Sequence, residues 1–425
     1  MNGFHSKSFS IVVERPDPGQ IQKERFPLRY GTYSEIRTAD HEFRFNLNGE
    51  IKFIRGLDPT WPHPAEQLKR TDGNDWVYYS VGDDSSDRGL ISWMGEYYLP
   101  CLPYPSNAVW EIDYRSNPRI MTAFAAWSQL YADLHGVQQN RFQARERDLV
   151  QRILVHHDGV LFDRTRQLTG IIGGRASVLP PDTRHVDYEV IPLFIADGCR
   201  YRCRFCCVKS DQSFRVRNLS DIREQVRRLR GFYGRNLANY QALFLGNHDA
   251  LAAGESAILT AVTEAGEAVD FSGPAAREPF LFMFGSVDAF LEAGPQLFDK
   301  LNDTPFYTYI NIGLESVDGP TLKAIGKPVD VYRVREAFLK MLEINLSHPN
   351  LEITANFLIG QTLSADHDQA LAELLGDAPV LPQDKGTVYL SPLKDSPKKR
   401  ELLPRFFEIQ ARSRLPVFVY LIQRL

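Results

Sequence analysis

The stretch that decides the fold covers residues 190–210 and reads VIPLFIADGCRYRCRFCCVKS. An apolar run typical of a buried strand leads directly into a loop with four of the chain's five cysteines, Cys199, Cys203, Cys206 and Cys207. Thiolates gathered at fixed spacing usually hold a metal ion or a cluster, because a soft anionic sulfur is costly to bury without a cation. The sequence therefore predicts a metal or cluster site directly after a strand.

Length and composition indicate a globular protein of two or three domains. The chain has 425 residues, of which 43% are hydrophobic and 12% aromatic, enough for a sizeable core. Its first thirty residues lack the apolar segment of a signal peptide, and no apolar run approaches the roughly twenty residues that span a membrane. The clustered cysteines argue against a disulfide framework and for a reducing compartment. We therefore expect a cytoplasmic protein without membrane association.

Strands and helices alternate in the second half of the chain. Six predicted strands, each followed by a helix, succeed one another from VIPLFIA at 190–196 to TVYLSPL at 387–393. Continuous apolar strands separated by helices indicate a parallel sheet that is covered by helices. We predict an α/β fold with an incomplete (β/α)6 barrel of the TIM type, which places its chemistry at the carboxyl ends of the strands.

The chain divides into three predicted parts. Residues 1–180 contain short aromatic runs, among them FRFNLNGEIKF at 43–53, which predicts a hairpin with an Asn48-Gly49 turn. This part is expected to be an α+β accessory domain of unknown role, which ends in a proline-containing linker. The barrel is expected at 186–395, and residues 396–425 are expected to add a helix and a strand. Further strands, DWVYYSV and AVWEIDY, and helices around 118–135 and 141–154 are predicted within the first part.

The spacing of three cysteines indicates a cluster with one open iron. Cys199, Cys203 and Cys206 form C-x3-C-x2-C directly after the first strand of the repeating part. Three thiolates hold three irons of a cubane and leave the fourth open, whereas four would close the site. With Phe205 before the third cysteine, this motif resembles the signature of radical S-adenosylmethionine (radical SAM) enzymes.

The resemblance implies one 4Fe-4S cluster, with the three cysteines as its metal ligands and catalytic residues, and Phe205 beside the cofactor. In that family the open iron binds S-adenosylmethionine (SAM), and an electron from the reduced cluster breaks a carbon-sulfur bond. The products are methionine and a 5′-deoxyadenosyl radical. A low-potential electron donor such as flavodoxin or ferredoxin is the implied partner.

A structural zinc site is the competing interpretation of the cysteine loop. Zinc sites usually pair two knuckles, and no second C-x2-C or H-x3-H follows this one. Cys207 is expected to be a buried neighbour of the ligands, and Cys101 is expected to pack as a small hydrophobe. These two leftover cysteines are too few for a second four-cysteine cluster.

A second strand end resembles the glycine-rich motif that holds the amino end of SAM in the same family. It reads LFLGNHDAL at 243–251 and implies Gly246, Asn247 and Asp249 as cofactor contacts. The sequence departs from the family pattern, because Asn247-His248 replaces the second glycine and the acid. A simple strand-to-helix turn remains the alternative.

Two later strand ends also resemble family motifs. The run INIGLESVDGPTLKAIGKP at 310–328 is similar to the G-x-E-S and L-K-x-I-x-K pattern of one branch. That branch includes tRNA methylthiotransferases, elongator-type enzymes and oxygen-independent coproporphyrinogen oxidases, and it implies that Glu315 contacts the ribose or the methionine part of SAM. A helix-capping carboxylate beside Ser316 is the alternative. FLIGQT at 357–362 resembles the motif near the adenine and implies Gly360 as a contact.

The charge of the chain is uneven. Between Arg200 and Arg235 there are eleven Lys or Arg against three Asp or Glu, so this segment is about +8 in a chain of net charge −4. The run is either a solvated helix face or a compensation for an anionic cofactor or substrate. A long positive track, which RNA binding requires, is not visible elsewhere. The charge pattern therefore does not favour a nucleic-acid partner.

We expect a radical SAM enzyme that cleaves SAM reductively and abstracts hydrogen from a small-molecule or peptide substrate. The alternatives are a tRNA-modifying radical SAM enzyme, a non-catalytic iron-sulfur electron-transfer or sensor protein, and a zinc-stabilised binding module.

Overall fold

The computed structural model describes most of the chain. The described residues are 4–5, 8–16, 20–23, 26–29, 31–57, 77–79, 94–96, 118–174, 189–206, 212–246, 248–269, 271, 279–393 and 399–420. Several predictions concern residues outside these ranges: Cys101, Cys207, Asn247, the linker at 177–185 and the strand AVWEIDY at 108–114.

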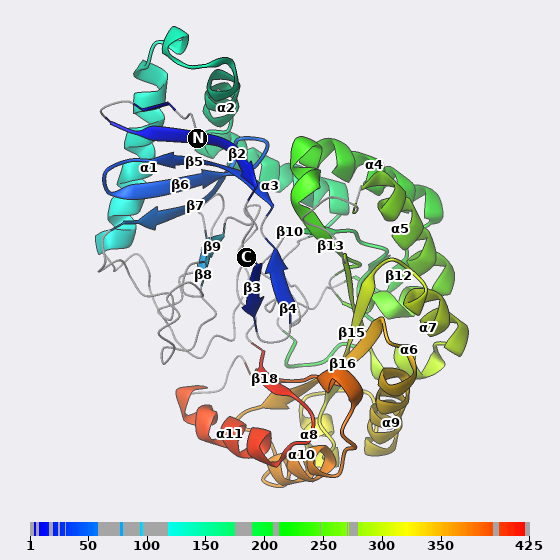
Figure 1. The fold of residues 1–425 in the computed structure, drawn as a ribbon. Coiled ribbons are helices and arrows are strands. Elements are labelled where there is room, and N and C mark those ends of the chain that lie inside the picture. Colours follow the sequence, from blue (N-terminus) through cyan, green and yellow to red (C-terminus); the bar gives the residue numbers. More distant parts are fainter. Residues whose placement is uncertain are drawn as a thin grey trace.

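The N-terminal part contains a five-stranded antiparallel sheet with helices packed against it (Figure 1). The strands lie in the order β1 (Phe4–His5), β2 (Ser10–Pro16), β5 (Thr32–Arg37), β6 (His41–Phe45) and β7 (Ile51–Gly56). Helices α1 (Pro118–Gly136) and α2 (Ala144–Val155) confirm the two predicted helices. Two further pairs of short strands are β3 (Gln20–Lys23) with β4 (Phe26–Arg29), and β8 (Val77–Tyr79) with β9 (Met94–Glu96).

The predicted hairpin is confirmed, and it supplies much of the core of this part. Phe43 and Phe45 point to one face of β6, as the alternation requires, and both pack on Trp127 of α1 with ring centroids 6.2 Å and 5.7 Å apart. Gly49 closes the turn with a φ of 84°, where a side chain would also collide with the backbone of Arg152 at 2.7 Å.

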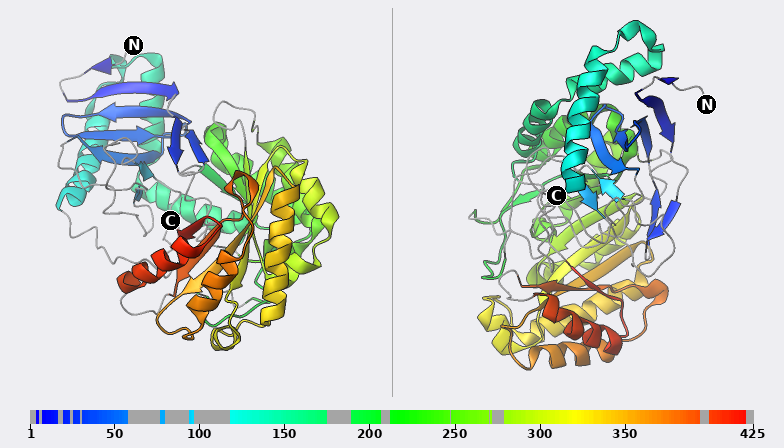
Figure 2. Two further views of the ribbon diagram at one scale, coloured as in Figure 1. Left: turned by 60° about the horizontal axis from the view of Figure 1, so that its bottom comes forward. Right: turned by 90° about the vertical axis from the view of Figure 1, so that its left-hand side faces the viewer.

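The second half of the chain forms a seven-stranded parallel sheet wrapped by helices (Figure 2). Its strands lie in the order β10 (Glu189–Pro192), β13 (Tyr240–Phe244), β14 (Phe280–Gly285), β15 (Tyr307–Glu315), β16 (Leu351–Ile359), β17 (Val388–Pro392) and β18 (Val417–Val419). This is the predicted partial barrel with one strand more, because β18 from the C-terminal extension pairs with β17. No ladder joins β10 to β18 among the described residues, so the barrel is open on that side.

The helices of the barrel follow the predicted order, except that β14 and β15 are each followed by two helices instead of one. They are α4 (Leu219–Tyr233), α5 (Glu255–Ala268), α6 (Val287–Glu292), α7 (Pro295–Asn302), α8 (Gly319–Ala324), α9 (Val331–Ser347), α10 (His367–Gly376) and α11 (Leu403–Arg412). After β14 the expected single helix is divided into α6 and α7, because Pro295 has no N–H to continue α6 and instead begins α7. No helix among the described residues is long and apolar enough to cross a lipid bilayer.

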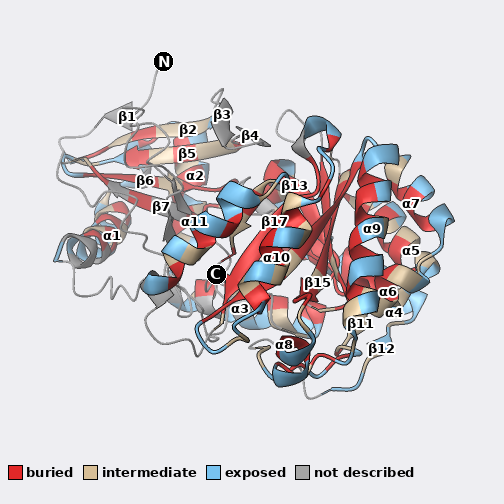
Figure 3. Ribbon diagram, turned by 90° about the horizontal axis from the view of Figure 1, so that it is seen from below, coloured by how far each residue is buried: buried red, intermediate tan, exposed pale blue. Residues whose placement is uncertain are grey.

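The strands of the barrel are buried on both faces, as Figure 3 shows. On β15, Ile310 and Ile312 belong to the large apolar core. The alternate residues Tyr309 and Asn311 point to the other face, where Tyr309 stacks on Phe282 with ring centroids 5.5 Å apart. On that face Asn311 Nδ2 donates a hydrogen bond of 2.9 Å to Thr354 Oγ1. Burial on two faces explains why these strands read as continuous apolar runs.

Helix α3 (Asp158–Ile172) takes part in both cores. Leu161 packs in the N-terminal core, whereas Leu168, Ile171 and Ile172 pack in the barrel core. The α+β domain boundary near residue 180 stays a prediction, and the packing of α3 shows that the two cores share one helix.

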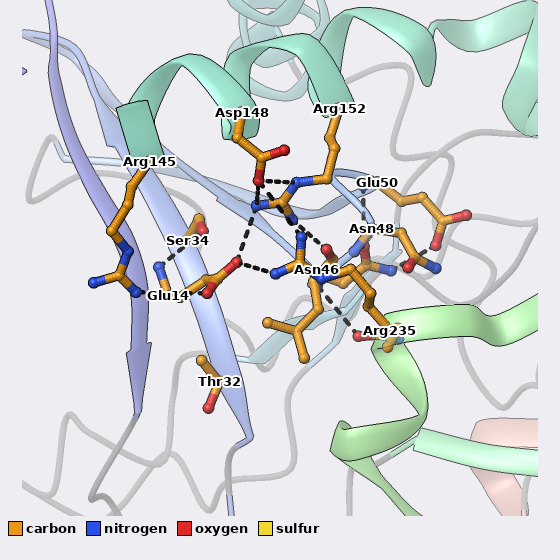
Figure 4. Close-up of polar contacts among 12 residues, drawn as sticks. Glu14, Thr32, Ser34, Asn46, Asn48, Glu50, Arg145, Asp148, Arg152 and Arg235 are labelled. Carbon is orange, nitrogen blue, oxygen red and sulfur yellow. Dashed lines mark hydrogen bonds and ion pairs between the residues drawn. The ribbon is translucent and has the colours of Figure 1, made fainter. Parts of the chain in front are cut away.

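A network of asparagines and charged side chains joins the two parts at the amino end of β13. Asn239 lies one residue before β13, where its Oδ1 accepts from Thr32 N at 2.8 Å and its Nδ2 donates to Thr32 O at 3.0 Å. Asn48 Nδ2 of the hairpin turn donates to Tyr233 O at 2.8 Å. Arg235 binds Glu14 at 2.8 Å, and Arg152 of α2 binds the same carboxylate at 3.0 Å (Figure 4).

Candidate functional site

A two-stranded ribbon closes the cysteine loop at its base. β11 (Ala196–Asp197) and β12 (Arg215–Val216) pair in antiparallel register. Asp197 accepts hydrogen bonds from Arg215 at 3.1 Å and from Arg217 at 3.0 Å, which ties the two ends of the loop together. Gly198 enters the loop with a φ of 67°, and a Cβ there would stand 2.5 Å from Gln212 O. The loop therefore has a fixed base at the carboxyl end of the first barrel strand.

The three predicted cluster ligands all lie on this loop. Cys203 is buried, Cys199 and Cys206 are half-buried, and the three cysteines form no disulfide with one another. The backbone N–H of Tyr201 donates to Cys199 Sγ at 3.4 Å. Arg204 N donates to Ile325 O at 2.8 Å, which fastens the loop to the chain after α8.

The described residues include no group of three or more His, Cys, Asp or Glu placed to hold a single metal ion. In a cubane each cysteine binds a different iron, so its thiols need not converge on one point. The donor set of three soft thiols on one loop fits such a cluster. The three ligands stay predictions.

Burial disfavours ionisation of the cysteine thiols. Burial raises the pKa of Cys199, and it raises the pKa of Cys203 to about 11. Lys327 partly offsets the effect, because its positive charge lowers both pKa values. A thiol in this environment is neutral near pH 7 unless a metal displaces its proton, so a bound metal or cluster would make the thiolates.

Glu315 is the predicted cofactor contact with the most unusual geometry. A bulge shifts the register of β15 between Gly313 and Glu315, and Glu315 has a φ of 68°. This left-handed conformation is strained for a residue with a side chain. It brings the carboxylate back over the strand, where Glu315 Oε1 stands 2.6 Å from the position that a Cβ on Gly313 would take. Only glycine at position 313 leaves room for this arrangement.

The helix-capping alternative for Glu315 does not match the structure. Asp318 caps α8 instead, since its carboxylate accepts from Thr321 N at 2.9 Å. Ser316 is also engaged elsewhere, with its Oγ 2.8 Å from His367 Nδ1. The carboxylate of Glu315 itself accepts a hydrogen bond of 3.4 Å from Asn356 Nδ2. Burial raises the pKa of Glu315 even though Lys327 lies beside it.

Lys327 is the residue of this site that the sequence analysis did not single out. Its Nζ lies 3.6 Å from Glu315 Oε1 and 5.1 Å from the ring centroid of Tyr201 in the cysteine loop. The only signal in the sequence was its place in the L-K-x-I-x-K run. A lysine is rarely buried without a role, because desolvation of the ammonium group is costly. Lys327 places a positive charge between Glu315 and the thiols.

Asp249 lies at the end of the second barrel strand with one free acceptor atom. Its Oδ1 accepts from Ser286 N at 2.8 Å, whereas its buried Oδ2 has no hydrogen-bond partner among the described residues. Its side chain does not cap the short 3-10 helix Ala250–Ala253 that follows, so the turn alternative does not explain it. Burial raises the pKa of Asp249. Gly246 begins the turn with a φ of 103°.

The two remaining predicted contacts have structural surroundings of their own. Gly360 O accepts from Arg405 Nη1 at 3.3 Å, and a Cβ on Gly360 would stand 2.8 Å from Leu393 Cδ1. Phe205 is half-buried and packs on the barrel core. Contacts of Gly360 and Phe205 with a cofactor stay predictions.

The basic run between Arg200 and Arg235 is balanced by carboxylates over most of its length. The ion pairs are Arg200 with Glu292, Arg215 and Arg217 with Asp197, Arg223 with Glu264, Arg227 with Glu224, and Arg235 with Glu14 and Asp148. The run is therefore neither a purely solvated face nor a large store of free positive charge.

Comparisons with known proteins found one family profile and several solved structures. Residues 193–375 match the sequence profile of the Radical SAM superfamily, and no curated protein sequence matches the chain. A radical SAM methyltransferase from Sphaerobacter thermophilus is 15% identical with a TM-score of 0.37, over 57% of this chain and 68% of that chain. Methylornithine synthase (PylB) is 9% identical with a TM-score of 0.36, over 68% and 74% of the two chains.

The cobalamin-dependent SAM radical enzyme OxsB is 15% identical with a TM-score of 0.32, over 53% of this chain and 31% of that chain. The profile match does not extend to a branch of the superfamily, so the predicted branch stays a prediction. Through residues 193–375 this chain carries a radical SAM domain, the domain of enzymes that use a 4Fe-4S cluster and SAM.

Proposed function

We propose that this chain cleaves SAM reductively at a 4Fe-4S cluster held by Cys199, Cys203 and Cys206, and abstracts hydrogen from a small-molecule or peptide substrate. When bound, the cluster and SAM supply a 5′-deoxyadenosyl radical. The observation that carries the proposal is the trio of buried charges at the cysteine loop, Asp249, Glu315 and Lys327. A cluster alone needs no carboxylate at its side, whereas a cofactor with an ammonium group, a carboxylate and ribose hydroxyls matches these three side chains.

Each member of the trio has a chemical task toward SAM. The free Oδ2 of Asp249 can accept a hydrogen bond from an ammonium group, such as the amino group of the methionine part. Lys327 can face a carboxylate, and its charge also compensates the thiolates. Glu315 can accept from ribose hydroxyls, with Asn356 donating to its other side. Burial keeps water away from these contacts and strengthens them.

The surroundings of the loop favour a small substrate over RNA. Six arginines of the basic run are held by carboxylates, and affinity for a polyanion needs many free cations in a track. The unpartnered acceptor of Asp249 also favours an enzyme over a simple electron carrier, because a carrier has no use for a second ligand beside its cluster.

The test is anaerobic reconstitution with iron and sulfide, reduction by dithionite and incubation with SAM. We expect 5′-deoxyadenosine to form, and the Cys203→Ala variant to form none. A cluster that assembles and cycles without 5′-deoxyadenosine would indicate an electron carrier or sensor. Stoichiometric zinc in place of iron after reconstitution would indicate a zinc-stabilised binding module.

A further inference from the structure

His367 is a buried histidine that the proposed function does not use. It lies at the start of α10, and both of its ring nitrogens are engaged. Nε2 stands 2.8 Å from Leu358 O in β16, and Nδ1 stands 2.8 Å from Oγ of Ser316, the residue that follows β15. The ring therefore bridges the carboxyl ends of two strands, of which β15 ends at Glu315 and β16 leads to Gly360.

The hydrogen bonds of this bridge run in one direction. A backbone carbonyl can only accept, so Nε2 carries the proton of the imidazole and Nδ1 is left as an acceptor. Ser316 Oγ has one proton, and Nδ1 at 2.8 Å is a nearer acceptor than Asp318 O at 3.5 Å. The hydroxyl oxygen accepts in turn from Asp318 N at 3.0 Å. Burial lowers the pKa of His367, so the ring is neutral near pH 7 and keeps this arrangement.

Ser316 also closes a strained turn around Glu315. Its N–H donates to Leu314 O at 2.9 Å, and the residue between them, Glu315, has a φ of 68°. A hydrogen bond between residues two apart, with a positive φ at the centre, defines the rare and strained form of the γ-turn. Such a backbone persists only where its surroundings fix it. The hydroxyl that His367 holds provides this constraint one residue after the carboxylate.

We propose that Ser316 and His367 form a positioning pair that holds the carboxylate of Glu315 toward SAM. The inference rests on the proposed function, because it assigns Glu315 a contact with that cofactor. The pair itself does not touch SAM and acts through the backbone of the γ-turn. Without the bond between hydroxyl and imidazole, the turn can relax toward an extended strand, which moves the carboxylate away from its place beside Lys327.

The bridge is suited to positioning more than to general stability. Leu371, Ala372 and Leu375 already pack α10 in the barrel core. A buried imidazole loses its hydration, and its two hydrogen bonds mainly offset that loss. What the bridge adds is a fixed arrangement of two strand ends, because a fully satisfied buried polar network specifies one geometry.

The test compares two substitutions at His367 that each keep one of its two hydrogen bonds. The side-chain oxygen of Asn can replace Nδ1 as the acceptor for Ser316, whereas the side-chain nitrogen of Gln can replace Nε2 as the donor to Leu358 O. Ser316→Ala removes the hydroxyl itself. Isothermal titration with the reconstituted, unreduced protein gives the SAM dissociation constant, so the measurement does not depend on turnover.

We expect His367→Gln and Ser316→Ala each to weaken SAM binding about threefold or more, as for the loss of a hydrogen bond. His367→Asn should weaken it by less than about twofold, which is the scatter of sites that do not interact. In urea, the cluster-free Asn and Gln variants should lose similar amounts of stability, because each lacks one buried hydrogen bond. A purely structural role predicts the same SAM affinity for both.

A double-mutant cycle shows whether the pair acts through Glu315. In the Glu315→Gln background, Ser316→Ala should weaken SAM binding by less than about twofold, because the carboxylate that the pair positions is already absent. Asn345→Ala is the matched control, since it removes two buried hydrogen bonds to the backbone of Ile353 in the amino-terminal half of β16. It should lower the stability and leave the SAM dissociation constant unchanged.

Several outcomes would overturn the inference. SAM that binds Ser316→Ala as tightly as the wild type, or equally weakened binding in His367→Asn and His367→Gln, would make the bridge a structural feature while leaving the proposed function intact. A full effect of Ser316→Ala in the Glu315→Gln background would separate the pair from that carboxylate. If the His367 variants assemble no cluster, the cycle with Ser316→Ala decides alone.

Failure of the wild type itself to assemble a cluster or to bind SAM would remove the proposed function, and the inference with it. Nitrogen NMR of the histidine-labelled, cluster-free protein checks the bridge independently, with His367→Gln identifying the signals. The ring of His367 should be protonated at Nε2. A proton on Nδ1 would contradict the bridge.

Discussion

Lys327 and Glu315 form an ion pair beside the cysteine loop, with 3.6 Å between Lys327 Nζ and Glu315 Oε1 and side chains that are only 3% and 7% exposed. Each charge is costly to bury and is compensated mainly by the other. Burial raises the pKa of Glu315, whereas the charge of Lys327 lowers it. The pair therefore contributes little to stability, whereas its two charges are suited to binding a charged cofactor.

Removal of Lys327 should reveal the energetic cost of burying the Glu315 carboxylate. Lys327→Met should lower the free energy of unfolding by about 3 kcal/mol, because it leaves the carboxylate of Glu315 buried without a cation. The double variant Lys327→Met/Glu315→Gln should recover part of the loss, since it buries no charge. Urea unfolding of the cluster-free protein measures both.

Lys300→Met, which breaks the exposed pair with Glu255, serves as the control and should cost less than about 1 kcal/mol. Equal losses for Lys327→Met and Lys300→Met would contradict the assigned burial penalty.

The conservative change at Glu315 tests its contact with the cofactor. Glu315→Gln keeps the shape of the side chain but leaves Lys327 buried without its carboxylate, so it should lower the thermal midpoint. It should keep the cluster and weaken SAM binding severalfold. Isothermal titration with the reconstituted protein gives the dissociation constant. An unchanged constant would make Glu315 a structural residue.

Asp249→Asn tests the free acceptor in the same way. The amide can still accept from Ser286 N with its oxygen, which leaves an NH2 group where the ammonium group of SAM would need an acceptor. SAM binding should weaken about tenfold or more, as expected for a lost hydrogen bond to a charged group. Asp299→Asn, at an exposed carboxylate that binds His348 at the other end of the barrel, should leave the dissociation constant unchanged. Equal constants for wild type and Asp249→Asn would remove Asp249 from the cofactor site.

The cluster-free protein should lose stability in alkaline solution because of Cys203. Its pKa is about 11 in the folded chain against an ordinary value of 9.0, so the folded state binds the proton more tightly than the unfolded state. The resulting stabilisation is complete below pH 9.0 and is lost as the pH rises through about 11. Cys203→Ser, which does not ionise in this range, should show a smaller loss of unfolding free energy between these pH values. A loss as large as in the wild type would place its origin outside Cys203.

Replacement of each of the five cysteines by alanine should separate those that bind the cluster from those that do not. Cys199, Cys203 and Cys206 should each be required for iron content and for the visible charge-transfer absorption, because their spacing suits one cubane with an open iron. Cys101→Ala and Cys207→Ala should retain both signals. Loss of the cluster in Cys101→Ala, or its retention in Cys203→Ala, would refute the ligand set.

The joint between the N-terminal part and the barrel gives a prediction on stability. A Cβ on Gly31 would stand 2.1 Å from Asn239 Oδ1, so Gly31→Ala should cost about 2 kcal/mol. Asn239→Ala removes two hydrogen bonds to Thr32 and should cost a similar amount. The double variant should cost less than the sum, because the colliding amide is then absent. Strict additivity in urea unfolding would contradict the contact.

The sequence was informative wherever a local pattern decides the structure. The hairpin at Phe43 and Phe45 follows from alternation and its Asn48-Gly49 turn, and the barrel follows from repeated apolar strands before helices. The cysteine loop was placed correctly because it follows the first of these strands. The two-residue strands β11 and β12 were not foreseen, since two residues carry no periodicity.

The site was harder to predict because its contacts join distant parts of the chain. Lys327 meets Tyr201 of the cysteine loop only after the barrel has formed. The φ of 68° at Glu315 runs against the preference of any residue with a side chain, and no sequence pattern signals it. Asn239 and Thr32 are 207 positions apart, and the sequence alone offers no reason to pair them.

The buried amides at the joint also limit how this chain can be recombined with others. Asn236 and Asn239 are 2% and 1% exposed, and both contact the N-terminal part, through Leu47 N and Thr32. A gene fusion that placed a different N-terminal segment before this barrel would leave both buried amides without these hydrogen-bond partners.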